Sequence, residues 1–123
     1  MDKQNLEMEL AHFTGSYSLH RFSRLFSQHV MTDGVKYLAD NAGAYWLVEA
    51  IASHHHKCRG ESFQVWELHK TKTGSAMLTC TGWGDVKIAT QRIPFTDFPL
   101  DEIKLYCAQE TESCWVIMLP TEY

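Results

Sequence analysis

The segment from His54 to Cys58, which reads HHHKC, is the densest group of metal-ligating side chains in the sequence. If a helix continues through it, His54 and Cys58 lie on one helical face, and imidazole and thiolate are good zinc ligands. A closed zinc site needs four ligands, however, and this spacing supplies a single pair. A frayed helix end, whose basic residues face the negative end of the helix dipole, explains the segment better. We therefore expect no metal and no cofactor, and His54 and Cys58 are weak candidates.

A basic and aromatic group, formed by Tyr17, His20, Arg21 and Arg24, is the second place where residue types suggest chemistry. Guanidinium and imidazole groups that lie close together can bind a phosphate or a carboxylate. The same residues can equally form the polar face of an amphipathic helix, which is the more ordinary interpretation. Residues 16–31 give no clear signal for helix, strand or loop, because serines interrupt their apolar spacing.

Signatures of covalent catalysis and of nucleotide binding are missing from the sequence. It contains no G-x-S-x-G nucleophile elbow, no Walker loop and no G-x-G-x-x-G. Cys58 lies near a helix C-terminus, where the helix dipole disfavours a thiolate. Cys80 and Cys107 fall on the apolar faces of expected strands, and we interpret them as core residues. Whether the chain is an enzyme stays open, and the residues favour the view that it is not.

The elements that must position these residues begin with three expected helices. The first ends at Thr14-Gly15, with Gly15 suited to a left-handed cap. The second begins after Thr32, which can cap it, and is broken at residues 41–43. The third runs over residues 44–56 and carries the widest apolar face of the three.

After Gly60 the apolar residues alternate with polar ones, a period that is typical of half-buried strands. Short connections separate these runs, so we expect an antiparallel sheet of about four or five strands, all from residues 60–123. Helices followed by strands predict an α+β fold, in which the helical residues 1–59 pack on one face of the sheet. We expect Trp46 to be buried between the third helix and the sheet.

Length and charge narrow the classes of function. The 123 residues fit one domain, over residues 1–123, and 45% of them are apolar. The net charge of −4 gives no electrostatic footprint for nucleic acid or for an anionic membrane. No apolar run approaches the roughly 20 residues of a membrane span, and the N-terminal residues do not resemble a signal peptide. We expect a cytoplasmic protein that binds neither nucleic acid nor membrane.

Several stretches of the sequence together point to a family. They are LAHFTGS at residues 10–16, TDGVKYLADNAGAYWLVEAIAS at 32–53, TDFP at 96–99 and LPTEY at 119–123. The chain resembles an uncharacterised prokaryotic family, a domain of unknown function found in bacterial, phage and plasmid genomes. The resemblance spans nearly the whole chain and implies a stand-alone prokaryotic protein, often on mobile DNA. It passes on no catalytic residue, and residues 54–62 depart from the family pattern, which makes a functional metal site there less expected.

The resemblance also brings residues of these motifs forward. Thr14 and Gly34 have a structural interpretation as turn or cap residues, whereas Asp33 is either a partner of the helix dipole or a ligand. His12 and Tyr45 are polar-tipped residues beside apolar stripes, a setting that is common for a satisfied core hydrogen bond. The residues that we name as candidates for binding a ligand or a partner are His12, His20, Arg21, Asp33 and Tyr45.

Two hypotheses for the function follow. The first is a small, non-enzymatic binding protein of a bacterial or mobile-element genome, which engages a protein partner or a second copy of itself. An inhibitor of a defence system is one form of this hypothesis. The second is a small enzyme or ligand-binding domain, whose pocket would lie between the helices and the sheet and use His20, Arg21, Asp33 and a further histidine.

Overall fold

The helix that follows Thr32 forms where its cap residues predict it. In the computed structural model, which describes residues 2–123, α2 spans Asp33–Ala42. The Thr32 hydroxyl accepts a hydrogen bond from the backbone N–H of Val35 at 3.4 Å, so it provides a partner for a first-turn amide. Gly43 ends the helix with a φ of 60°, a left-handed conformation that glycine adopts without steric cost. Both ends of this helix confirm the prediction.

The first helix, α1 (Lys3–Leu10), is shorter than its apolar spacing predicts. Beyond it, the backbone N–H groups of His12 and Phe13 bond to carbonyls three residues back, so the chain continues as tight turns. Phe13 still packs against the core, which explains why the spacing suggested a longer helix. The predicted end at Thr14-Gly15 is therefore wrong, and the backbone of Gly15 is not left-handed.

The helix expected over residues 44–56 is two helices, α3 (Tyr45–Ser53) and α4 (His55–Cys58). They are separated at His54, whose φ of −92° and ψ of 9° depart from helical values. The buried face of α3 and the buried Cys58 of α4 both contact the core. Because buried residues continue across the break, the apolar period alone does not reveal it.

Five strands come from the second half of the chain, as the alternation of apolar and polar residues predicts. They are β3 (Phe63–Lys70), β4 (Ala76–Thr81), β5 (Lys87–Ile93), β6 (Glu102–Thr111) and β7 (Cys114–Met118). All pairings among these five strands are antiparallel. The short turn η1 (Trp83–Asp85) joins β4 to β5, and η2 (Pro120–Glu122) follows β7.

Two further strands, β1 (Leu19–His20) and β2 (His29–Thr32), come from the half of the chain that was expected to be helical. The sheet therefore has seven strands, in the order β1-β2-β7-β6-β3-β4-β5. It is mixed, because β2 pairs with β7 in parallel, whereas a purely antiparallel sheet of four or five strands was predicted. All four residues of β2 are buried. A strand this short and buried on both faces shows no alternation, so the sequence did not reveal it.

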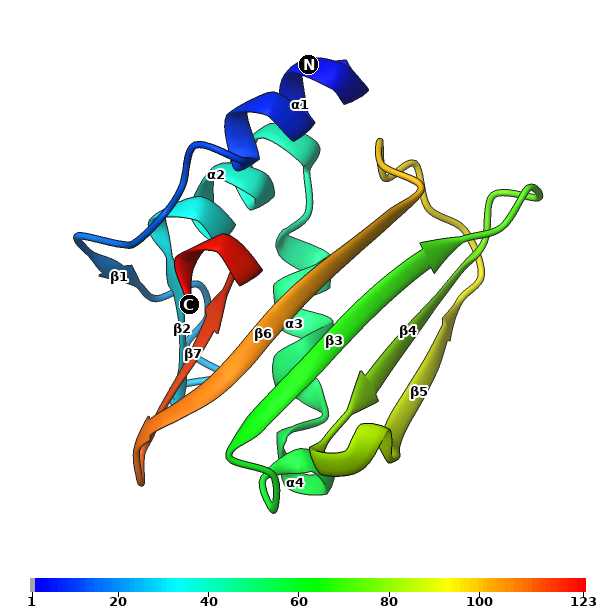
Figure 1. Cartoon of the computed structure of the whole chain (residues 1–123). Coiled ribbons are helices and arrows are strands. Elements are labelled where there is room, and N and C mark those ends of the chain that lie inside the picture. Colours follow the sequence, from blue (N-terminus) through cyan, green and yellow to red (C-terminus); the bar gives the residue numbers. More distant parts are fainter. Residues whose placement is uncertain (1) are drawn as a thin grey trace.

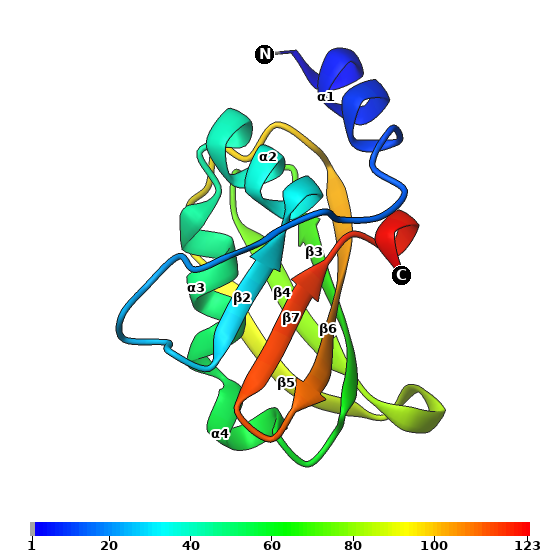
Figure 2. The ribbon, with the colours of Figure 1, turned by 90° about the vertical axis from the view of Figure 1, so that its left-hand side faces the viewer.

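The helices α3 and α4 lie against one face of the sheet, and α2 follows directly from β2 (Figure 1). Figure 2 shows β2 beside β7, with residues 11–28 crossing in front of α2 and β2. The main core lies between helices and sheet and includes the fully buried Trp66 and Trp115. A smaller cluster of Val30, Val116 and Met118 lies apart from it. Among the described residues, no helix has the length and apolar character needed to cross a membrane.

Trp46 is half-buried, not enclosed between α3 and the sheet as predicted. Its ring meets that of Phe98 edge-on, with centroids 6.3 Å apart, so it packs on the segment between β5 and β6. Leu47, Val48 and Ile51 fill the position that was expected for it. The position of Trp46, about 100° around the helix from Leu47, puts it at the border of the buried face.

Candidate functional site

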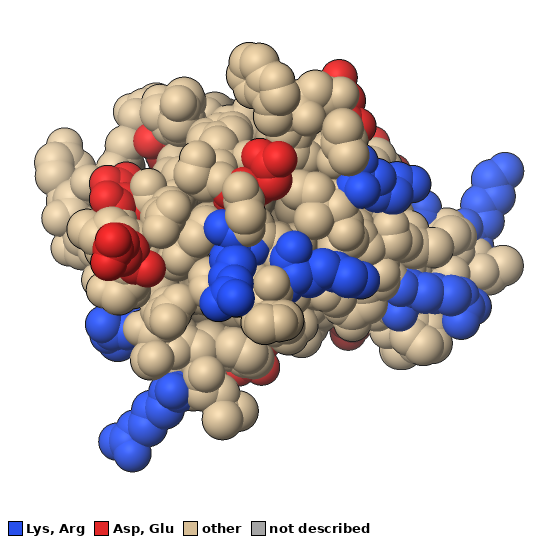
Figure 3. Space-filling model, turned by 90° about the horizontal axis from the view of Figure 1, so that it is seen from below, with Lys and Arg blue, Asp and Glu red and all other residues tan. Residues whose placement is uncertain are grey.

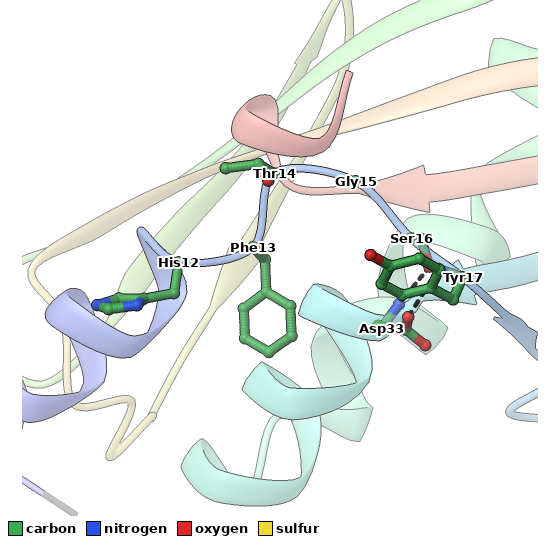
Figure 4. Close-up of a pocket in the computed structure, with 7 residues that line it drawn as sticks. All are labelled: His12, Phe13, Thr14, Gly15, Ser16, Tyr17 and Asp33. Atoms are coloured by element: carbon green, nitrogen blue, oxygen red, sulfur yellow. Dashed lines mark hydrogen bonds between the residues drawn. The ribbon is translucent and has the colours of Figure 1, made fainter.

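Asp33, the first residue of α2, ties the start of this helix to the residues that precede β2. Its Oδ1 lies 2.7 Å from Nε2 of His20, and its Oδ2 accepts a hydrogen bond of 2.9 Å from the backbone N–H of Tyr17. In return, the backbone N–H of Asp33 donates to Oγ of Ser16 at 2.9 Å. The dashed lines in Figure 4 mark the bonds to Ser16 and Tyr17. We call residues 11–28 the 11–28 loop, and these contacts hold its first half in place.

The electrostatics of Asp33 follow from the same contacts. The hydrogen bond from His20 is the largest cause that lowers the pKa of the Asp33 carboxyl, followed by the bond from the Tyr17 amide. The carboxylate is therefore ionised at neutral pH, with each oxygen already bonded to a group of the protein. An oxygen that is occupied in this way is poorly placed to take a proton from a substrate or to bind a metal.

A second carboxylate, that of Glu122 in η2, binds the same end of α2. It accepts hydrogen bonds from the Thr32 hydroxyl at 2.6 Å, from the Gly34 amide at 3.0 Å and from the Leu119 amide at 3.0 Å. A Cβ atom on Gly34 would lie 2.6 Å from both Glu122 and Leu119. Gly34 was predicted to be a turn or cap residue, and the structure adds that its missing side chain admits Glu122 to the helix end.

The two carboxylates decide what the start of α2 can bind. The N-terminus of a helix attracts anions, because its first amides are unpaired and its dipole is positive there. Here Asp33 and Glu122 supply the negative charge, and Thr32 and Glu122 accept from first-turn amides. A phosphate or carboxylate ligand would have to displace them. The arrangement is a structural clamp that joins the 11–28 loop, α2 and the last residues of the chain.

A surface pocket of about 500 Å³ opens beside this clamp and is lined by residues 12–17 and Asp33 (Figure 4). The His12 ring points away from Asp33, and Phe13 points toward α2, where its ring centroid lies 5.4 Å from that of Tyr37. His12 and Asp33, two of the predicted site residues, thus share a pocket without forming an acid–base pair. The pocket lies on the surface and not between the helices and the sheet, where core side chains fill the space.

Arg21 and Tyr45, two other predicted site residues, form hydrogen bonds outside the pocket beside Asp33. The Arg21 guanidinium donates to the backbone carbonyl of Ser27 and so closes the second half of the 11–28 loop. The Tyr45 hydroxyl donates to Asp40, a contact that raises the pKa of the phenol. Asp40 also forms an ion pair of 2.8 Å with Lys36. The Arg21 guanidinium and the Tyr45 hydroxyl therefore both have hydrogen-bond partners within the protein.

His54 and Cys58, the weak metal candidates, point to different partners. Nε2 of His54 lies 2.7 Å from Oε1 of Gln91. Cys58 is buried beside Cys80, and burial raises the pKa of both thiols. Cys107 is also buried, and its pKa is raised to about 12, so it confirms the prediction of a core thiol. Within residues 2–123, no group of three or more metal-ligating side chains is arranged to hold an ion.

A close pair of imidazoles, of which His29 is buried and His55 is half-buried, was not foreseen from the sequence. His29 in β2 is only 3% exposed, and its ring meets that of His55 edge-on at 5.0 Å. Burial is the main cause that lowers the pKa of His29 to about 4, and His55 adds to it. The His55 ring in turn meets Trp115 at 5.1 Å, and burial lowers its pKa too. No spacing rule joins residues so far apart, so only the packing of α4 against β2 and β7, through the ring contacts of His55, reveals the pair.

Two residues of the clamp, Ser16 and Glu122, were also missed, and Tyr17 was placed in the basic and aromatic group without the backbone bond to Asp33. Ser16 closes the motif LAHFTGS and Glu122 lies in LPTEY, so the motifs themselves were the available signal. Side chain–backbone bonds between distant segments leave no periodicity. The motif ends and the TDG of the central stretch meet at the start of α2, which gives these motifs a shared structural role.

The surface of the 11–28 loop is exposed and basic. Tyr17 is fully exposed, and Leu19 and Leu25 are exposed as well. The 11–28 loop contains two arginines and two histidines and no acidic residue, in a chain whose net charge is −4. Basic side chains also gather across the underside of the molecule (Figure 3), the end at which α4 lies in Figure 1. The negative net charge therefore conceals local positive regions.

The comparisons with known proteins give a family and a fold. The model of a family of unknown function (DUF6876) matches residues 4–123. A solved structure, a protein of unknown function from Enterococcus faecalis, is 16% identical and superposes with a TM-score of 0.58. The match covers 86% of this chain and 98% of that chain. At this identity the likeness shows the fold alone. No curated protein matches the chain.

Proposed function

Because the chain belongs to a family of unknown function (DUF6876), its role has to be derived from its own surface, and we propose that it is a non-enzymatic protein that binds a protein partner through the 11–28 loop. The observation that carries this proposal is a loop that exposes large apolar side chains while internal contacts hold it in place. Leu25 is 87% exposed, and Tyr17 is fully exposed. Exposed apolar groups of this size are typical of surfaces that bind other proteins.

The clamp gives the loop a shape before any partner arrives. Asp33 and Ser16 fix its first half, and the bond from Arg21 to the Ser27 carbonyl fixes its second half. A loop that is already ordered loses less conformational entropy on binding than a mobile one does. An exposed Tyr can then serve as an anchor, since aromatic residues carry much of the binding energy at protein interfaces.

The charge of the loop indicates the kind of partner. Arg21 and Arg24 are exposed, and residues 11–28 include no Asp or Glu. Complementary potentials speed association and select among partners. The proposal is therefore that the partner presents an acidic surface with an apolar centre that receives Tyr17 and Leu25.

The setting of the partner is also a proposal. The resemblance to proteins of bacterial, phage and plasmid genomes favours a host or phage macromolecule in the cytoplasm, and an inhibitor of a defence system fits this setting. The second candidate function is a small-ligand site, and the pocket of about 500 Å³ beside Asp33 is the observation that favours it. The internally bonded carboxylate of Asp33 disfavours an enzymatic role for that pocket.

The test is affinity capture from a native host with three forms of the protein. They are the unaltered chain, the double variant Tyr17→Ser with Leu25→Ser, and the control Met8→Gln, which replaces an exposed apolar residue on α1. We expect one stoichiometric protein with the unaltered chain and with the control, and its loss with the double variant at unchanged melting temperature. Retention by the double variant, or a co-purified small molecule in place of a protein, would contradict the proposal.

A further inference from the structure

The strand β5 is an uncovered edge of the sheet. It is last in the strand order and pairs only with β4. Among residues 2–123, no backbone hydrogen bond joins β5 to any segment other than β4. Alternate residues of an edge strand carry backbone N–H and C=O groups that point away from the sheet and can pair with another strand. β5 is seven residues long, so its alternate residues offer outward-pointing backbone groups for such pairing.

Large apolar side chains are exposed at both ends of this edge. Trp83, in the turn before β5, is 89% exposed, and Val86 beside it is exposed as well. Phe95, just after β5, is 78% exposed and lies near Gly74 in the turn between β3 and β4. Charged side chains and an irregular register protect natural edge strands from chance pairing, and β5 has both. The exposed aromatic residues at its two ends favour contact with a selected partner instead.

The positive charge of β5 favours pairing with an acidic strand over pairing with a basic one. Lys87 and Arg92 are exposed, and the strand contains no acidic residue. The register places Lys87 beside Thr81 and Arg92 beside Met77, on the sheet face that is turned away from the buried Leu78 and Cys80. An antiparallel pair of two β5 strands would bring Lys87 and Arg92 of both copies to one two-stranded ribbon, and β5 has no acidic residue to offset their repulsion. A strand with acidic residues at these places would instead be stabilised.

We propose that β5 is a docking edge, to which an extended and acidic segment of a partner protein adds as a further antiparallel strand. Main-chain hydrogen bonds would supply much of the affinity, as in other cases of strand addition. Lys87 and Arg92 would select acidic residues, and the exposed Trp83 and Phe95 would contact the ends of the added strand. This edge lies at the other end of the sheet from β1, which is part of the 11–28 loop, so the proposal does not depend on binding by that loop.

The probe for this proposal is a short peptide that alternates Val with Thr and carries two Glu residues on the face that would meet Lys87 and Arg92. The matched control peptide carries Lys at both of these positions. Backbone amide shifts of the full chain are followed by NMR as either peptide is added up to millimolar concentration. The protein variant is Lys87→Glu combined with Arg92→Glu, and the control variant is Lys104→Glu, which reverses an exposed charge on β6.

The Glu peptide is expected to shift amides of β5 and its flanking turns, and the double variant is expected to weaken this binding by about tenfold. The Lys104→Glu variant should bind as the unaltered chain does. Three results would overturn the proposal: no shift in β5 at millimolar peptide, equal binding of the Lys peptide, or shifts confined to other segments. A concentration series that shows β5 shifts without any peptide would assign the edge to a second copy instead.

Discussion

Asp33 and Glu122 both lie at the first turn of α2, and both use their carboxylate oxygens for groups of the protein itself. The sequence indicated Asp33 and His20 as binding residues, and the structure brings them together at 2.7 Å. Their contact stabilises a loop and leaves no free acid or base. The distinction could not be made from the sequence, because a carboxylate that clamps and one that catalyses look the same there.

Replacing Gly34 with Ala tests the clamp at the level of one atom. The added Cβ would approach Glu122 and Leu119 to 2.6 Å. The contacted atoms are side-chain ends, but the Glu122 carboxylate cannot move away without weakening its bonds to Thr32 and Leu119. We therefore expect the overpacking cost of about 1–3 kcal/mol to outweigh the gain of about 1 kcal/mol in helix propensity. Chemical denaturation should therefore show a less stable protein. The matched control is Gly60→Ala, where a Cβ meets no atom within 4 Å, and a similar loss there would show that the clamp is not the cause.

Acid is expected to destabilise the protein through His29. The folded-state pKa of His29 is about 4, below its ordinary value of 6.5, so the unfolded state binds a proton first as the pH falls. The stabilising effect of neutral His29 is complete above about pH 6.5 and is lost between pH 6.5 and 4, a loss of about 3 kcal/mol.

The measurement is urea denaturation at pH 7 and at pH 4 for the unaltered chain and for His29→Gln. The variant should lose less stability than the unaltered chain over this interval. His56→Gln, which changes an exposed histidine of α4, serves as the control and should keep the full pH dependence. An equal pH dependence in His29→Gln and the unaltered chain would rule out His29 as the source.

At the scale of elements, the sequence predicts those whose signals are local. α2 has its cap in Thr32 and its stop in Gly43, and the strands of the second half follow the alternation of apolar residues. β2 was missed because its four residues are all buried and carry no alternation. Residues 16–31 were left undecided, and most of them belong to the 11–28 loop. The shape of this loop depends on bonds to Asp33, which lies outside it, so no local pattern could define it.

At the scale of the whole molecule, an α+β fold with helices against the sheet was predictable, whereas the size and mixed character of the sheet were not. The parallel pairing of β2 with β7 joins residues from the two halves of the chain, and such long-range pairing leaves no trace in composition or period. The same pairing places the 11–28 loop at one edge of the sheet and leaves β5 as the other. The two proposed contact surfaces are therefore far apart in the strand order.

The central claim is that the 11–28 loop is the surface that binds a protein partner. Amide hydrogen exchange of the free chain, compared with that of the chain in its captured complex, tests this claim directly. We expect slower exchange in the complex over residues 16–25, around the exposed Tyr17 and Leu25. A complex in which the exchange of these residues is unchanged, while other segments become protected, would contradict the claim.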